Sequence, residues 1–369
     1  MTPATTSAPA QRRSRLRSAG LLTGLTIALL LMAVVAVGVG QLPIPPAEII
    51  GSVLHHIDSG LESLLHLRLP LDLGPLPHHP QGDNALWKVR FPRVALAVLV
   101  GASLATAGAL MQGVFGNPLA EPSVVGVSSG AAVGASLVIV TGVTWLGNWT
   151  IAAAAFSTGL ATTLLVHSLS RAGRRTEVVT LVLTGIAVNS LAFTLISFAT
   201  FIADTSAREQ LVFWQLGSLN GATWQAVSAV APFTLVGLAA AFVLARRLDL
   251  LALGDRSASH LGVDVEKLRL VAIVVVALLV GASVAFSGII GFVGLVVPHL
   301  IRMIAGPGHR LLLPASALAG GVLVICADLL ARTLIRNADL PIGMITSLVG
   351  APFFFWLLRR TRARQGGWG

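Results

Sequence analysis

The chain has 369 residues, of which 55% are hydrophobic and 11% are charged, and its mean hydropathy is +0.85. Soluble domains carry about a quarter charged residues, so this composition excludes a soluble protein and indicates an integral membrane protein. The net charge of +10 could indicate a nucleic-acid partner or membrane topology, and its distribution along the chain decides between them. The single cysteine, Cys326, can form no internal disulfide and is predicted to be a small buried hydrophobe.

The N-terminal segment, residues 1–20, is polar and rich in arginine, which predicts a disordered cytoplasmic tail. The apolar run that follows, 21–40, is too long for the apolar region of a cleaved signal peptide and lacks a small-residue cleavage site. We therefore expect an uncleaved first membrane span. Residues 21–360 are predicted to form one transmembrane domain, with a short cytoplasmic tail at 361–369.

Apolar runs of about 20 residues recur along the whole domain. Their length favours α-helices over barrel strands, which are about half as long and alternate in polarity, so the predicted fold class is an all-α polytopic membrane protein. Counting each run once predicts about ten spans, at 21–40, 94–112, 123–142, 149–169, 178–203, 224–245, 268–286, 289–305, 311–331 and 341–358.

Lysine and arginine lie mostly on one side of these spans. An even number of spans puts both termini on the same side, and with the N-terminus inside, 18 of the 25 basic residues fall in cytoplasmic segments against 7 outside. The positive-inside rule therefore predicts cytoplasmic termini in a bacterial inner membrane. Topology explains the basic balance, and no nucleic-acid partner is needed.

Two short segments of the chain are alike. Residues 99–108 and 279–288 are identical at 7 of 10 positions, which chance similarity between Ala/Gly-rich runs could also produce. They fall in spans two and seven, which cross in opposite directions. The match thus favours an inverted repeat of spans 2–5 and 7–10, an arrangement common in transporters.

The segment 41–89 is predicted to be a long extracytoplasmic loop, with a short amphipathic helix at 46–54. It holds five of the nine histidines, which could contact haem or a metal but in a surface loop are more often simply solvated: His55, His56, His66, His78 and His79. We favour the second interpretation. The role of this loop is left open.

Sequence motifs for catalysis are missing from the chain. It contains no Gly-x4-Gly-Lys-Ser/Thr motif, no His/Cys/carboxylate cluster with metal-ligand spacing and no pattern of nucleophile and base. Ser128 and Ser129 are better explained by helix packing. The sequence therefore predicts no catalytic residue, no metal site and no bound cofactor in this chain.

The stretch 90–135 carries the most specific pattern. It contains Arg90-Phe-Pro-Arg93, a Gly/Ala-rich span ending at Gln112, the motif Asn117-Pro-Leu-Ala-Glu-Pro122 and then Gly126-Val-Ser-Ser-Gly-Ala131. These motifs resemble the permease subunits of type II ABC importers, the FecCD family, which carries ferric siderophores, haem and cobalamin. The resemblance extends over about 25–360, so it is specific for the family and not for the substrate.

The resemblance implies two partner surfaces. On the cytoplasmic side, the region 254–266 matches the family's coupling helix, which docks on the ATPase, although a plain connecting turn is the alternative. Asp255 would cap or begin this helix, Ala258 and Leu261 would form an apolar edge, and Gly262 would end it; Arg256 completes the surface. Outside, Arg90, Arg93 and Arg332 match arginines that pair with acidic residues of the substrate-binding protein, with interfacial anchoring as the alternative.

Span five carries hydroxyl side chains that fall within about 140° of one another on a helix: Thr180, Thr184, Ser190, Thr194 and Ser197. They could pack against other helices. The resemblance, in which this span borders the translocation channel at the dimer axis, favours a path. We further expect Asp328 to pair with Arg332 at i, i+4, and Asp339, near Arg336, to shape the turn before span ten.

The predicted function is the permease subunit of an ABC importer that carries an iron complex, with haem slightly favoured over a ferric siderophore. A cobalamin importer of the same family is the alternative, and an ion-coupled secondary transporter is a more distant one. The expected partners are a second copy of the chain, two ATPase subunits that use ATP and Mg, and an extracytoplasmic binding protein.

Overall fold

The computed structural model describes residues 8–40, 42–66, 73–172, 175–335 and 338–364. In these ranges the regular structure is helical apart from one two-residue antiparallel pair, β1 (Arg171–Ala172) and β2 (Arg175–Thr176). The apolar helices are α1 (Ala8–Gly38), α4 (Phe91–Phe115), α5 (Val127–Thr141), α6 (Thr150–Leu169), α7 (Val178–Ile202), α9 (Trp224–Leu251), α11 (Val265–Ser287), α12 (Val293–Ala305), α13 (His309–Thr333) and α14 (Ile342–Arg364).

Each predicted span coincides with one of these helices, which confirms the all-α class. Seven of them are long and apolar enough to cross a membrane, whereas α5, α12 and the apolar part of α14 are shorter. The chain enters α5 through a Gly- and Pro-containing connection at 116–126 and enters α12 through a Gly-containing one at 288–292, and both take up part of the predicted spans. The number of ten crossings stays a prediction.

Both chain ends differ from the sequence prediction. Helix α1 begins at Ala8, so the prediction of a disordered tail is wrong for residues 8–20. The reason is that most of residues 8–20 are Ala, Gln, Arg or Leu, which are strong helix formers, and that the stretch continues directly into the first apolar run. Helix α14 likewise continues to Arg364, into the predicted C-terminal tail.

Helices α4 and α11 form the centre of the bundle. Their most apolar windows are 83% and 72% buried, against 17% for α7. Small residues permit this packing: a Cβ atom on Gly101 would clash with the carbonyl group of Gly320 on α13, and one on Gly108 would clash with that of Gly294 on α12. The two halves of the predicted repeat contact each other in the same way: α4 of the first half packs on α12 and α13 of the second, and α11 of the second half packs on α5 and α6 of the first. This exchange fits the inverted repeat.

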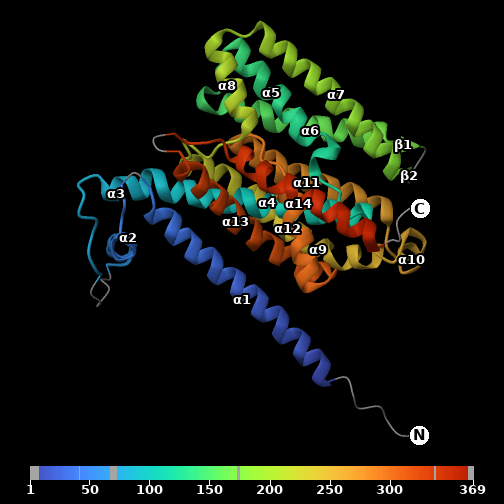
Figure 1. Cartoon of the computed structure of the whole chain (residues 1–369), viewed down its shortest axis with the longest axis horizontal. Helices are drawn as coiled ribbons and strands as arrows, with labels where there is room; N and C mark the ends of the chain where they lie inside the picture. The colour runs from blue at the N-terminus through green and yellow to red at the C-terminus, as the bar shows by residue number, and fades with distance from the viewer. Residues whose placement is uncertain (1–7, 41, 67–72, 173–174, 336–337, 365–369) are drawn as a thin grey trace.

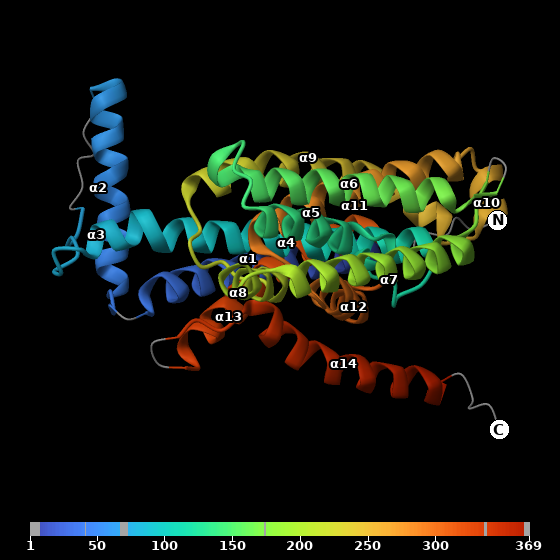
Figure 2. The ribbon, with the colours of Figure 1, turned by 90° about the horizontal axis from the view of Figure 1, so that it is seen from above.

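The remaining helices surround this centre. Figure 1 shows α5, α6 and α7 as a layer on one side, and α1 inclined on the other side, where it packs on α13. In Figure 2, α14 leans away from the bundle. Short helices lie in the connections: α2 (Pro46–Leu65), α3 (Gly82–Ala85), α8 (Thr205–Leu216) and α10 (Asp255–His260).

The bundle has two distinct ends. One, which we call the α10 end, carries α10, β1 and β2, the start of α1 and the finish of α14 (Figures 1 and 2). The other, the α2 end, carries α2 and α3. Since the start of α1 and the finish of α14 share one end, the helical path agrees with an even number of crossings. The predicted helix at 46–54 is present as the longer α2.

Candidate functional site

Arg93 lies in the first turn of α4 at the α2 end and pairs with two carboxylates. Its Nε donates to Asp328 Oδ1 at 3.0 Å, and its Nη1 donates to Asp339 Oδ2 at 2.9 Å. The Asp328 side chain is 2% exposed, so these bonds compensate a buried charge. Arg332 Nε is 3.6 Å from Asp328 Oδ2, so the expected i, i+4 ion pair is present, and Arg93 is an additional, closer partner of Asp328. Asp339 binds Arg93, while Arg336 lies outside the described residues.

Arg90 and Arg332 also donate to carbonyl groups at the C-terminal end of α1 and in the residues just after it. Arg90 Nη1 donates to the carbonyl of Val37 at 2.6 Å, and its Nη2 donates to the carbonyl of Leu42. Arg332 Nη1 donates to the carbonyl of Val39 at 2.9 Å, and its Nη2 donates to that of Ala36. The last carbonyl groups of a helix have no intrahelical partner and carry partial negative charge, so two guanidinium groups satisfy and stabilise them.

A π-helical segment, η1 (Leu86–Arg90), gives the two neighbouring arginines different partners. Arg90 is its last residue and turns towards α1, whereas Arg93, in the α-helix that follows, faces α13. Neither docking nor interfacial anchoring anticipated these intramolecular contacts. They do not test docking, which stays a prediction, but they show where most donors of Arg90, Arg93 and Arg332 are directed.

The five hydroxyl residues of the predicted stripe all lie on α7 and differ in exposure. Thr180 and Thr184 are half-buried, and Ser190, Thr194 and Ser197 are exposed. The hydroxyl groups of Ser190 and Thr194 donate to backbone carbonyls one turn earlier, at 2.9 and 3.0 Å. Around them α7 exposes large apolar side chains such as Phe193 and Phe201. The surface is therefore mostly apolar, and its role as a path stays a prediction.

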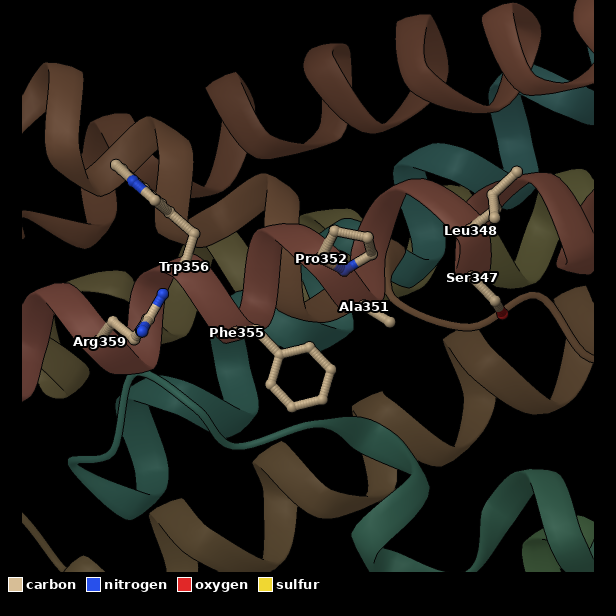
Figure 3. A pocket seen from close by; sticks show the side chains of 7 residues that line it. All are labelled: Ser347, Leu348, Ala351, Pro352, Phe355, Trp356 and Arg359. Atoms are coloured by element: carbon tan, nitrogen blue, oxygen red, sulfur yellow. The ribbon is translucent and has the colours of Figure 1, made fainter.

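Helix α14 has a second exposed apolar face. Figure 3 shows Ser347, Leu348, Ala351, Phe355 and Arg359 along one side of this helix. They line an open hollow of about 630 Å³ whose walls come entirely from α14. In a single chain this face of α14 is uncovered.

Helix α10 protrudes at the α10 end between α9 and α11. Gly254 and Gly262 flank it with φ of +98° and +83°, which only glycine adopts readily, so both ends of this short helix turn sharply. Asp255 begins the helix and accepts a hydrogen bond from Arg269 Nη2 at 3.0 Å. Arg256 is exposed.

Ala258 and Leu261 do not share an exposed edge, contrary to our expectation. Ala258 is 0% exposed because it faces the chain's own core, where α10 contacts α9 and α11. Leu261 follows the last helical residue and is 57% exposed. Beside α10 a hollow of about 800 Å³ is lined by charged side chains including Glu177, Arg256 and Asp264.

Glu121 is a half-buried side chain whose contact sequence reasoning missed. It lies in the connection between α4 and α5, and its Oε1 accepts a hydrogen bond at 3.3 Å from the backbone N–H of Phe292, which precedes α12. Phe292 has a φ of +67°, unusual for a bulky residue. Burial raises the pKa of Glu121, and the hydrogen bonds from Phe292 and Ser123 oppose that shift. Glu121 thus connects the segment that precedes α5 with the segment that precedes α12. The Ala-Glu-Pro motif was a signal for it.

The loop histidines make separate local contacts. His56 stacks on Trp87 with ring centroids 4.1 Å apart, and His78 Nδ1 pairs with Glu48. His55 Nδ1 lies 2.8 Å from the carbonyl oxygen of Gly51, and His79 Nδ1 accepts from a backbone N–H. Within the described ranges no group of three or more His, Cys, Asp or Glu side chains is placed to hold a metal ion.

Comparisons with known proteins cover nearly the whole chain. A family model described as the FecCD transport family matches residues 27–360. The hemin transport system permease protein HmuU of Yersinia pestis is 44% identical over 296 residues, 77% of this chain and 87% of that protein. The vitamin B12 import system permease protein BtuC of Klebsiella pneumoniae is 34% identical over 354 residues, 96% of each. A solved candidate metal-chelate type ABC transporter, in an inward-facing conformation, is 32% identical with a TM-score of 0.77, covering 92% of this chain and 99% of that one.

Proposed function

The chain belongs to the FecCD transport family, and from this premise we propose that it is the membrane-spanning subunit of an ATP-driven importer. The observation that carries the proposal is α10, a short helix outside the bundle that leaves Leu261 exposed beside a hollow. In this proposal two ATPase subunits dock at the α10 end and bind ATP and Mg. The permease itself performs no covalent chemistry, since its sequence has no phosphate-binding loop.

The proposed cargo is a metal chelate, with haem first, a ferric siderophore second and cobalamin as the alternative. The relatives named for hemin and for vitamin B12 support this class. The histidines of the α2 end make separate local contacts and give no support to one cargo over another, so the order rests on resemblance alone. A panel of haem, ferric siderophores and cobalamin, each tested for binding to the purified binding protein, would decide the cargo.

A second copy of the chain is the proposed partner within the membrane. The support is that α7 is only 17% buried and that the apolar hollow of α14 is uncovered in one chain (Figure 3). A homodimer that joins these faces would place the α7 hydroxyl stripes near a central path. Cysteine pairs introduced on α7 and α14 should cross-link between copies in membranes.

A binding protein is proposed to dock at the α2 end, above Arg90, Arg93 and Arg332. Because their donors bind α1 and two carboxylates, we propose that they act as a fixed positive surface rather than as mobile side chains. The proposed orientation puts the α10 end and both termini in the cytoplasm. The variant Arg332→Glu should then lower the affinity for the binding protein, and the loss should depend on salt concentration.

An ion-coupled transporter would need a titratable carboxylate inside the membrane. Asp328, in predicted span nine, is the carboxylate that could serve this role, and it is held by Arg93 and Arg332. The test is uptake into proteoliposomes. We expect transport to require the ATPase and ATP and to be insensitive to proton or sodium gradients. Gradient-driven uptake by this chain alone would overturn the proposal.

A further inference from the structure

A cavity of about 480 Å³ lies at the α2 end, between the last turns of α1, the first half of α2 and the starts of α4 and α9. This volume is within the range of about 300–1,000 Å³ typical of small-molecule sites. Its walls include Val34 and Val37 from α1, Val53 from α2, and Ala95 from α4, together with Trp87 and Trp224. No part of the cavity surface is polar.

The two tryptophans show why the cavity lining is apolar although it contains indole N–H groups. Trp87 Nε1 donates to Ser52 Oγ at 2.9 Å, and Trp224 Nε1 donates to the backbone carbonyl of Trp87 at 2.7 Å. Both indole N–H groups are therefore satisfied by protein, and the rings present apolar surface to the cavity. A ligand with carboxylates or amides would find no partner here, which excludes the polar chelates proposed as cargo.

The position of the cavity places it at the depth of the membrane interface. Helix α2 lies across the long axis of α1 and α4 in Figure 2, so it runs parallel to the membrane surface when the bundle spans the bilayer. Its apolar residues, such as Ile50, Val53 and Ile57, lie on one side, as in helices that lie in the membrane interface. Tryptophan is also typical of that depth. The outer face of α1 next to the cavity exposes Leu31 and Val35.

From these observations we propose that the cavity binds an acyl chain of a phospholipid from the leaflet at the α2 end. The cavity continues the lipid-facing surface of α1, its lining is wholly apolar, and α2 covers it at the level of the headgroups. Water would lose hydrogen bonds there, whereas a hydrocarbon chain fills the space with dispersion contacts. The chain would hold α1 and α2 together without any polar contact.

Photo-cross-linking tests the proposal on the full-length protein in vesicles of phosphatidylglycerol that carry a diazirine on one acyl chain. We expect peptides containing Val53 and Ala95 to be labelled, and to be labelled also when the protein is washed with detergent before irradiation. Ala95→Phe and, separately, Val53→Phe should fill the cavity and reduce the labelling of these peptides at least fivefold. Val243→Phe, at a lipid-exposed position of α9 that is 72% exposed, is the matched control and should change nothing.

Two outcomes would overturn the proposal. One is labelling that follows exposed area over α1, α7 and α9 and is unchanged in both cavity-filling variants. The other is a cavity labelled only by the acyl anchor of a lipoprotein and never by the phospholipid. Native mass spectrometry supplies a second readout: one retained phospholipid per chain in the wild type and in Val243→Phe, and none in the two cavity-filling variants.

Discussion

The two ends of the bundle use their charges in opposite ways. At the α2 end, Arg90, Arg93 and Arg332 turn inward and bind carbonyl groups or carboxylates of the same chain. At the α10 end, Arg256 is exposed, and Asp255 is more than half exposed although it pairs with Arg269. Sequence alone presented both regions as clusters of charged residues at the ends of spans. The difference teaches that charged side chains at a membrane boundary can be held by contacts within the chain at one end and left exposed at the other.

The largest expected effect comes from Arg93→Ala, which would leave Asp328 buried without its main partner. Removing one member of a buried ion pair costs about 3–5 kcal/mol of stability, whereas replacing both by apolar residues is often neutral. We therefore expect the double variant Arg93→Met/Asp328→Leu to recover most of the loss. Thermal unfolding in detergent, monitored by the reaction of the single Cys326 with a thiol dye, measures the stability of both variants. Equal stability of Arg93→Ala and wild type would contradict the structural role.

Arg90→Ala should have the next largest effect, because it leaves carbonyl groups at the end of α1 without donors. Each charge-assisted bond lost contributes about 1.5–3 kcal/mol. Lysine supplies fewer donors in a different geometry, so Arg90→Lys should recover only part of the stability. Protease accessibility of the segment joining α1 and α2 measures the effect locally. If Arg90→Lys is as stable as the wild type, anchoring at the membrane interface explains Arg90 better than specific bonds to the carbonyl groups of α1.

At the α10 end, Leu261→Asp should preserve the fold and weaken the ATPase complex by about 1–3 kcal/mol, the cost of burying a polar group without a partner. Ala258→Asp should instead reduce folded protein, since Ala258 is fully buried. Co-purification of the ATPase, with folded yield measured in parallel, separates the two results. Leu146→Asp, at a 60% exposed position at the α2 end, is the matched control. Retained ATPase binding in Leu261→Asp would remove α10 from the interface.

The smallest effect is expected at Glu121. Because burial raises the pKa of Glu121, the folded state favours the protonated form, and that stabilisation is lost as pH rises from the ordinary glutamate range through the raised pKa. Glu121→Gln should therefore match the wild type at low pH and become slightly more stable, by less than about 1 kcal/mol, at higher pH. Unfolding midpoints across pH measure this. Glu209→Gln, exposed on α8, serves as the control.

The sequence predicted helix positions well, and contacts between distant residues poorly. Apolar runs must become helices in lipid because backbone groups have no other partners there, so each predicted run coincides with a helix. The partners of Arg93 are 235 and 246 residues away, and no local pattern indicates them. Helix α8 was missed although Asp204 caps it, because its sequence is too polar to resemble a span. The burial of Ala258 likewise depends on α9 and α11, which periodicity within α10 does not reveal.

The bonds from Arg332 to the end of α1 have a consequence for biosynthesis. Val39 and Arg332 are 293 residues apart, so at roughly 5–20 residues per second a ribosome needs about 15–60 s to make the second after the first. During that interval α1 is already in the membrane, and the last carbonyl groups of its helix lack one of their two arginine donors. The first helix to be inserted is therefore among the last to acquire all of its hydrogen bonds to other helices. A nascent chain that stops before α13 would leave α1 loosely held and open to a membrane protease.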